Sequence, residues 1–138
     1  MTGIYQHTLD AKGRLFIPAK LREELGDVFY VTISMDPCLA LYSREAWQTV
    51  SDRVSAMSFV DQRKMRAIYA YAAKVELDAQ GRILLPQNLR EHAKLMKNVT
   101  VVGVNNHAEL WSSDVWDATC ADESSPENIA AVMEELHF

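Results

Sequence analysis

The sequence has no uninterrupted apolar run approaching the roughly 18 to 20 residues that a membrane span needs. Its first residues, Met1–Gln6, contain neither the basic stretch nor the apolar stretch of a secretory signal. Only two cysteines occur, Cys38 and Cys120, and they lie far apart without a metal-binding spacing. We therefore expect a cytoplasmic protein that does not enter membranes and whose two thiols are buried and reduced.

The chain also lacks the common signatures of enzymes. With only five glycines it has no glycine-rich phosphate loop, and it has no Gly-x-Ser-x-Gly nucleophile elbow. None of the four histidines has a metal-ligand spacing: His7, His92, His107 and His137. The sequence thus predicts a protein that is not an enzyme, with no metal, no cofactor and no small-molecule substrate. One enzymatic alternative, a small hydrolase, would use Asp10 and Asp78 as an acid pair and needs a concave pocket that holds both carboxylates.

The net charge of −5 at first argues against a nucleic-acid partner, but the charge is unevenly distributed. Seven acidic residues and no Lys or Arg follow residue 113: Asp114, Asp117, Asp122, Glu123, Glu127, Glu134 and Glu135. The first 113 residues therefore hold all 14 basic residues and 12 of the 19 acidic ones, a net charge of +2. A polyanion responds to the local field of the surface that it meets, so a basic binding face is compatible with this sequence.

The chain contains an internal repeat. Leu9–Glu23 recurs as Leu77–Glu91 at an offset of 68, with the Asp, Gly, Arg and Pro of the motif in register. A repeat of this extent indicates one supersecondary unit used twice. We predict a first repeat over residues 1–57, a helical connector over 58–74, and a second repeat with C-terminal helices over 75–138.

Each repeat is expected to begin with two short strands around a tight turn. In the first repeat the strands are Ile4–Leu9 and Arg14–Ile17, and they should pair as a hairpin with Lys12 at its tip. In the second repeat Val75–Leu77 should pair in the same way with Arg82–Leu85.

Helices should follow these strands at recognisable start signals. Pro18 and Pro86 suit the first turn of a short helix, because proline has no N–H to leave unpaired there. Gly26 suits the end of the first of these helices. After two further strands in each repeat, Ser43 and Ser112 are predicted to cap another helix.

One repeat alone is too small to bury enough apolar surface. Two such units packed around a pseudo-twofold axis can close a small barrel between them. We therefore predict an α+β fold in which two intertwined units make one domain.

The repeated Asp-x-x-Gly-Arg turn is the main candidate functional feature. Asp and Gly are expected to form the turn itself, through side-chain bonds to backbone N–H groups and a positive φ: Asp10, Gly13, Asp78 and Gly81. Arginine can fork onto phosphate or a guanine edge, and a two-stranded ribbon fits the major groove of DNA. The predicted DNA-binding residues are those that the turns carry: Lys12, Arg14, Gln80 and Arg82.

The alternative for these arginines is structural, with each guanidinium merely paired to a nearby carboxylate. The two turns also differ, because Lys12 in the first copy is replaced by Gln80 in the second. Glutamine can contact adenine or a phosphate oxygen but releases no counterion. The first turn should therefore supply more of the salt-dependent affinity.

Other charged or apolar surfaces have a more ordinary explanation as solvated or packing faces. Lys20 and Arg22 are candidate phosphate contacts beside the first turn. Arg90 with Lys94 and Lys97 can likewise flank a phosphate path, and Arg63 with Lys64 and Arg66 form a third basic group on a predicted helix. The apolar face of the last predicted helix can pack either on its own domain or on a neighbouring subunit.

Several segments resemble the bacterial MraZ family over nearly the whole chain. They are Tyr5–Arg14, Ile17–Lys20, Asp78–Arg82, Val101–Asn106 and Glu109–Ser112. The family often has a basic residue after the Asn pair, whereas this chain has His107-Ala108.

The resemblance implies two swapped-hairpin barrel units of the AbrB-like type in one chain. It also implies sequence-specific binding to double-stranded DNA, at short direct repeats upstream of the family's own operon for cell division and cell-wall synthesis. The implied protein is a ring-shaped homo-oligomer at the nucleoid that represses transcription. The rival hypothesis is a ring-forming scaffold for other proteins that does not read DNA.

Overall fold

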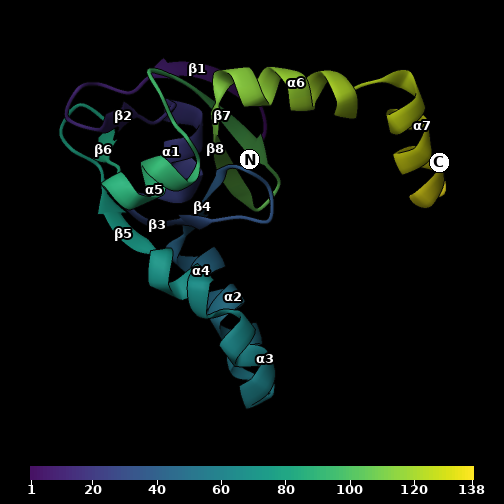
Figure 1. Ribbon diagram of the computed structural model, residues 1–138, viewed down its shortest axis with the longest axis horizontal. Coiled ribbons are helices and arrows are strands. Elements are labelled where there is room, and N and C mark those ends of the chain that lie inside the picture. The colour runs from purple at the N-terminus through teal and green to yellow at the C-terminus, as the bar shows by residue number, and fades with distance from the viewer.

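The computed structural model describes all 138 residues as one α+β fold (Figure 1). The strands are β1 (Ile4–Thr8), β2 (Arg14–Phe16), β3 (Val28–Ile33), β4 (Leu39–Ser43), β5 (Ala73–Glu76), β6 (Arg82–Leu84), β7 (Asn98–Val104) and β8 (His107–Ser112). The helices are α1 (Ala19–Leu25), α2 (Arg44–Ser55), α3 (Phe59–Lys64), α4 (Arg66–Tyr71), α5 (Gln87–His92), α6 (Ser113–Glu123) and α7 (Pro126–Glu135). Six strands form one sheet in the order β1-β7-β8-β4-β3-β5, and β2 and β6 form a separate two-stranded ribbon.

The strands around each turn pair with the other repeat, so the predicted local hairpins are wrong. β1 pairs with β7 and β5 pairs with β3, each in antiparallel register. β2 pairs with β6, with Arg14 opposite Leu84 and Phe16 opposite Arg82. This exchange lets each repeat cover apolar surface that the other leaves open, as expected for units too small to bury a core alone.

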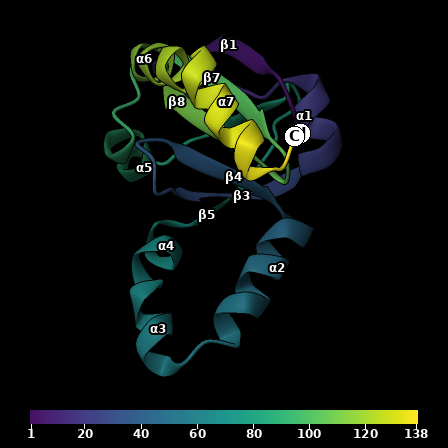
Figure 2. The ribbon, with the colours of Figure 1, turned by 90° about the vertical axis from the view of Figure 1, so that its right-hand side faces the viewer.

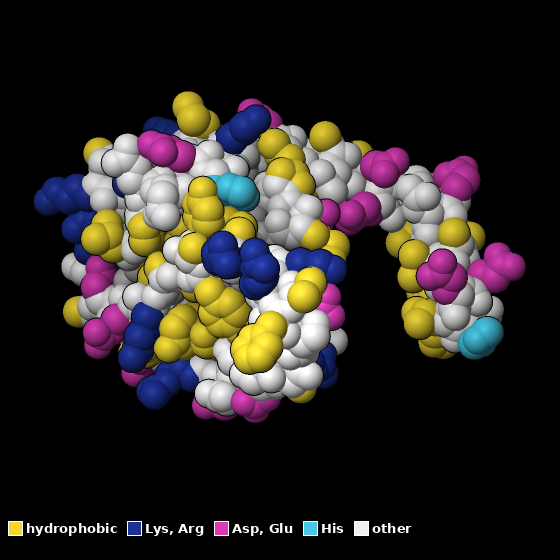
Figure 3. Space-filling view, turned by 60° about the horizontal axis from the view of Figure 1, so that its bottom comes forward, with side chains coloured by type: hydrophobic (Ala, Val, Ile, Leu, Met, Phe, Trp, Pro, Cys, Tyr) yellow, Lys and Arg dark blue, Asp and Glu magenta, His cyan; other side chains and the backbone are white.

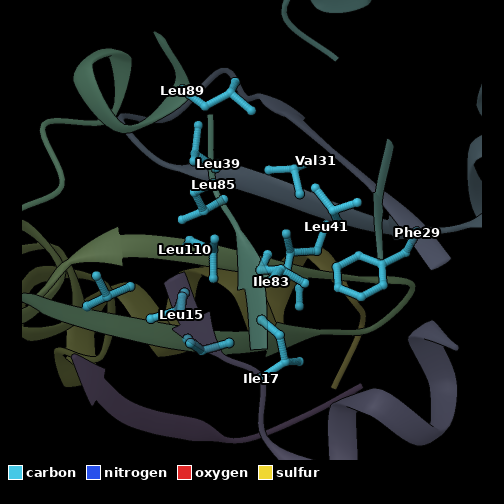
Figure 4. Packing of buried hydrophobic residues seen from close by; sticks show 14 of the residues in the cluster. Leu15, Ile17, Phe29, Val31, Leu39, Leu41, Ile83, Leu85, Leu89 and Leu110 are labelled. Carbon is cyan, nitrogen blue, oxygen red and sulfur yellow. The ribbon is translucent and has the colours of Figure 1, made fainter. Parts of the chain in front are cut away.

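The core lies where the ribbon covers the six-stranded sheet. Leu15 and Ile83 face inward from the ribbon and are buried. They meet Phe29, Leu41 and Leu110 from the central strands of the sheet in one cluster of 18 buried residues (Figure 4). Each fully buried side chain of this size contributes about 1.5–3 kcal/mol, so the contact between the repeats is central to the stability of the domain.

The two short helices that follow the ribbon strands begin where the sequence predicts. Pro18 and Pro86 occupy the cap positions immediately before α1 and α5. α1 buries Leu21 and Leu25, and it ends at Gly26, which has a φ of +82° and donates its N–H to the carbonyl of Arg22 at 2.9 Å. Glycine adopts this backbone conformation without a Cβ clash, so the predicted stop is confirmed.

Only one of the two predicted serine caps forms. The Ser43 hydroxyl accepts the Ala46 N–H at 3.1 Å at the start of α2. Ser112 occupies the corresponding position before α6, but its side chain makes no capping hydrogen bond and is buried. The next residue, Ser113, bonds instead with Thr100 at 2.9 Å and Gln6 at 3.2 Å, which ties α6 to β1 and β7.

Helices α2, α3 and α4 form an arch that connects β4 to β5 (Figure 2). Trp47 of α2 stacks on Tyr30 of β3 with ring centroids 5.2 Å apart, and it meets Tyr69 of α4 edge-on at 5.4 Å. Aromatic pairs of this kind add about 0.5–1.5 kcal/mol to burial alone. They hold the base of the arch to the sheet, while its tip at α3 extends away from the core (Figure 1).

The C-terminal helices leave the opposite half of the sheet. α6 packs on β7 and β8, and α7 turns away from the far end of α6 and projects beyond the sheet (Figure 1). No helix of the protein combines the length and the apolar character that crossing a membrane requires. Cys38 is buried as predicted, and burial raises the pKa of its thiol to about 12, whereas Cys120 is only partly buried.

Candidate nucleic-acid interface

Both Asp-x-x-Gly-Arg segments form the same turn. Oδ1 of Asp10 accepts the backbone N–H groups of Lys12 at 3.0 Å and Arg14 at 2.8 Å, and Gly13 has a φ of +81°. The second copy repeats this arrangement. Oδ1 of Asp78 accepts the N–H groups of Gln80 and Arg82, both at 2.9 Å, and Gly81 has a φ of +79°. The predicted role of the aspartates and glycines in forming the turns is confirmed.

The second carboxylate oxygen of each aspartate holds the arginine side chain. Nε of Arg14 donates to Oδ2 of Asp10 at 2.7 Å, and Nε of Arg82 donates to Oδ2 of Asp78 at 2.8 Å. Backbone N–H donation from the arginine residue, followed by its side chain, holds the pKa of each carboxyl group below its ordinary value. The structural alternative considered from the sequence, an arginine paired with a carboxylate, is therefore part of the geometry.

This pairing leaves the outer part of each guanidinium available. Neither Nη atom of Arg14 has a hydrogen-bond partner, and the side chain is 34% exposed. Arg82 is similar, with 28% exposure, except that one Nη donates to Oε1 of Gln80 at 2.8 Å. A carboxylate that binds Nε fixes the side chain while the terminal N–H groups keep the fork geometry suited to phosphate or guanine.

The two arginines share the outer face of the β2–β6 ribbon. Their partners across the ribbon, Leu84 and Phe16, lie on the same face, while Leu15 and Ile83 point into the core. In this register Arg14 and Arg82 are diagonal neighbours, whose Cα atoms are typically about 7–8 Å apart. The ribbon thus carries two arginines on its solvent face, each bound to the aspartate of its own turn.

A second pair of arginines crosses from one repeat to the turn of the other. A Cβ added to Gly81 would meet the guanidinium of Arg22 from α1, and one added to Gly13 would lie 2.9 Å from Cζ of Arg90 from α5. Cζ of Arg22 stands 5.1 Å from the centroid of the Phe16 ring, and Nε of Arg90 donates to the carbonyl of Leu85 at 3.1 Å. Each turn therefore carries one arginine of its own and one from the helix of the other repeat.

The surface around the turns is cationic despite the acidic chain. Five cationic residues stand against two aspartates there, which leaves +3: Lys12, Arg14, Arg22, Arg82 and Arg90 against Asp10 and Asp78. Lys12 is exposed at the first turn, and Lys20 is exposed on α1 without an ion pair. The side chain of Arg22 is half-buried, and its Nε is shielded from solvent without a partner.

Arg90 is the site residue that the sequence grouped differently. The sequence groups it with Lys94 and Lys97 as a possible phosphate contact, whereas the structure places its guanidinium against Gly13. The available signal was the repeat itself, because Arg90 stands in the second copy where Arg22 stands in the first. Strand exchange is what carries each of these residues to the other repeat's turn.

The proposed acid pair for hydrolysis has a different explanation. Both aspartates are bound by N–H groups of their own turns, and each also binds an arginine. A catalytic acid pair needs carboxylates that converge on one substrate. This geometry removes the reason for assigning that role to Asp10 and Asp78.

The fold and the ribbon define a two-repeat α+β protein with a cationic β-ribbon on its surface. The model of the family described as "MraZ protein" matches residues 1–67 and again residues 68–136, once for each repeat. The chain belongs to the MraZ family.

Three similar relatives are each named "Transcriptional regulator MraZ". The protein of Carboxydothermus hydrogenoformans is 44% identical, over 95% of this chain and 94% of its own length. That of Acetivibrio thermocellus is 45% identical over 97% and 96%, and that of Ligilactobacillus salivarius is 46% identical over 97% and 94%. The similarity therefore covers both repeats.

Proposed function

We propose that this protein is a transcriptional regulator that binds double-stranded DNA in a sequence-specific way. Its DNA sites are short direct repeats upstream of its own gene, and its effect is repression of the operon for cell division and cell-wall synthesis. It acts in the cytoplasm at the nucleoid, as a ring-shaped homo-oligomer. The names of the relatives support the regulatory role.

The observation that carries this proposal is the outer face of the ribbon. Arg14 and Arg82 both stand there, each held at Nε by an aspartate; the Nη atoms of Arg14 have no partner, and one Nη of Arg82 donates to Gln80. A two-stranded ribbon fits the major groove, where an arginine can fork onto a guanine edge. Lys12 and Gln80 contact the backbone or bases beside them, and Lys20 and Arg22 contact phosphate.

The exchanged strand pairing supports a swapped-hairpin barrel of the AbrB-like type. In this arrangement residues 1–57 and 75–138 are the two units, and residues 58–74 connect them. Each ribbon then contributes few contacts, and a ring brings several ribbons to spaced DNA repeats. Multivalent binding of this kind raises affinity through effective concentration, so a protein with few contacts per subunit can still be selective.

Titration of a fluorescent duplex that carries the upstream repeats tests the proposal. Arg14→Ala and Arg82→Ala should each lose about 1–3 kcal/mol of binding free energy, roughly a 5- to 150-fold weaker Kd. Arg53→Ala, which removes an exposed cation on the arch, is the matched control and should bind like the unchanged protein.

The scaffold hypothesis makes a different prediction for the same titration. Contacts to phosphate must weaken steeply as salt rises, because binding releases counterions from DNA. A protein scaffold would show no salt-dependent binding to the duplex. Equal affinity of the control, Arg14→Ala and Arg82→Ala proteins would refute the assignment of the ribbon.

A further inference from the structure

The β2–β6 ribbon has a pseudo-twofold axis through its centre. Leu15 pairs with Ile83, and these two residues occupy the same position in the two repeats. The flanking pairs place Arg14 and Arg82 at diagonal positions, so rotation by half a turn exchanges each ribbon residue with its repeat counterpart. Because β2 and β6 are antiparallel, the two Asp-x-x-Gly-Arg turns lie at opposite ends of the ribbon.

The arginine of the second turn is held at two atoms, whereas that of the first turn is held at one. Nε of Arg82 donates to Asp78 at 2.8 Å, and one Nη donates to Oε1 of Gln80, also at 2.8 Å. The first turn has only the bond at Nε of Arg14, because Lys12 stands in the place of Gln80 and offers no acceptor. Arg82 is therefore fixed in one orientation and still keeps three of its five N–H groups, whereas Arg14 is free to turn about a single bond.

The arginines that come from the other repeat also differ between the two ends. At the first turn, Nε of Arg90 donates to the carbonyl of Leu85 at 3.1 Å. At the second turn, Nε of Arg22 has no partner, and its Cζ stands 5.1 Å from the centroid of the Phe16 ring. The counterpart of Phe16 in the other repeat is Leu84, which has no ring. The two ends thus share one plan but not the same contacts.

The first end carries more positive charge than the second. Three cations and one acid leave +2 at the first turn, and two cations and one acid leave +1 at the second: Lys12, Arg14, Arg90 and Asp10, then Arg22, Arg82 and Asp78. Figure 3 shows dark blue side chains projecting from the left of the molecule, the side on which Figure 1 places β2 and β6, and magenta ones on the C-terminal arm at the right. A polyanion that meets the ribbon therefore meets two unequally charged ends.

We propose that the ribbon binds each DNA site in a single orientation, and that Gln80 and Lys12 set this orientation. The inference rests on the proposed DNA binding and adds the direction of reading to it. A twofold-symmetric reader fits a palindromic site, and it binds an asymmetric site equally well in either direction. A reader with unlike ends binds an asymmetric site more tightly in one direction than in the other.

The two tip residues act in different ways. Gln80 is a positioning residue: it fixes the guanidinium of Arg82, whose donors then cannot turn towards a wrong base. Lys12 is a mobile point charge that meets any phosphate, so the first turn adds affinity with less discrimination. A site bound in reverse keeps its phosphate contacts but loses the base contact of Arg82, and one such contact discriminates by about 5- to 150-fold.

Tethered cleavage of DNA by the full-length protein tests the orientation. Ala79→Cys places a thiol on the exposed second turn, to which an iron chelate that cuts nearby DNA is attached. Cys120→Ser removes the partly buried native thiol, and Cys38 is buried and stays unlabelled. On a duplex with the upstream repeats, cuts should fall at the same edge of every repeat, at least about fivefold above the opposite edge. The chelate on Ala11→Cys at the first turn should cut the opposite edge, and equal cutting at both edges would overturn the inference.

Exchange of the tip residues gives the decisive comparison. Lys12→Gln gives both ends a glutamine and Gln80→Lys gives both ends a lysine, so either change makes the two tips alike. Affinity for the duplex should fall in the first variant and rise in the second, because they release fewer and more counterions. The preference for one edge should nevertheless disappear in both. Arg53→Gln, which removes an exposed cation on the arch, should keep the preference, and a tip variant that keeps it would overturn the role of Gln80 and Lys12.

A structural effect of these changes would have a different result. Both tip residues are exposed, so neither variant should lose free energy of unfolding in urea, and a loss of edge preference then reports on the DNA contact alone. Failure of the proposed function is also distinct. In that case the unchanged protein would not bind the duplex, and the tethered proteins would cut neither edge above the level of free chelate, which would overturn both proposals.

Discussion

Replacing Gly81 by alanine tests how the second turn is packed. Gly81 has a φ of +79°, and an added Cβ would lie 2.9 Å from Cζ of Arg22 and 3.3 Å from Cε2 of Phe16. The Arg22 guanidinium stands over the Phe16 ring with Cζ 5.1 Å from its centroid. Because an arginine side chain is flexible, we expect the guanidinium to leave the ring while the backbone turn persists under strain.

The expected loss of unfolding free energy in Gly81→Ala has two parts. A left-handed backbone costs an L-residue about 1–2 kcal/mol, and loss of the contact between Arg22 and Phe16 costs about 0.5–1 kcal/mol. Gly81→Ala should therefore lower the free energy of unfolding by about 1.5–3 kcal/mol. Gly26→Ala is the comparison, because Gly26 has a φ of +82° but no atom within 4 Å of the added Cβ. Its cost of about 1–3 kcal/mol comes from the backbone alone.

Urea unfolding at one protein concentration separates the cost of backbone strain from the cost of losing the contact between Arg22 and Phe16. In a chain that already carries Arg22→Ala, the change Gly81→Ala should cost about 0.5–1 kcal/mol less than in the unchanged protein. The costs of Gly26→Ala and Arg22→Ala should simply add. If the costs of Gly81→Ala and Arg22→Ala add as well, with unchanged m-values, the Arg22 guanidinium does not rest on the second turn and the reasoning is refuted.

Two further predictions concern the charges of the turns. Folding lowers the pKa of Asp10 and Asp78 below the ordinary value of 3.8, so their stabilising contribution is complete above that pH and is lost as the pH falls towards the lower folded value. We therefore expect Tm to fall less between about pH 6 and about pH 3 in the double variant Asp10→Asn/Asp78→Asn than in the unchanged protein. Parallel curves of Tm against pH for the two proteins would contradict this. For the proposed DNA contact, Lys12→Gln should reduce the slope of log K against log salt by about 1 for each bound turn, and Gln80→Lys should increase it similarly. Equal slopes in binding titrations of all three proteins would show that neither tip meets phosphate.

Local features of this fold were predictable from single short segments. The Asp10 turn closes through bonds among five consecutive residues, Asp10–Arg14, so its geometry depends on little outside that segment. The same holds for the end of α1 at Gly26 and for the Ser43 cap. The prediction of the Ser112 cap was wrong, and burial alone does not explain it, because Ser43 and Ser112 are equally buried and only Ser43 caps its helix.

Strand partners could not be predicted in the same way. β1 and β2 flank one tight turn and look like a hairpin, yet β1 pairs with β7 and β2 pairs with β6. Alternating apolar residues say which face of a strand is buried but not which strand lies beside it. The choice depends on which pairing buries most apolar surface, and here it is the exchange between repeats.

The sequence by itself determined the twofold repeat, the two aspartate-glycine turns and the arginines that follow them, because all of these are encoded in contiguous residues. Only the tertiary structure decided that the arginines lie on one face of the same ribbon and that Arg22 and Arg90 lie against the turns of opposite repeats. The physical reason is that neither repeat can bury its apolar face alone, so the chain gains its core by exchanging strands. That exchange brings distant cations onto one surface.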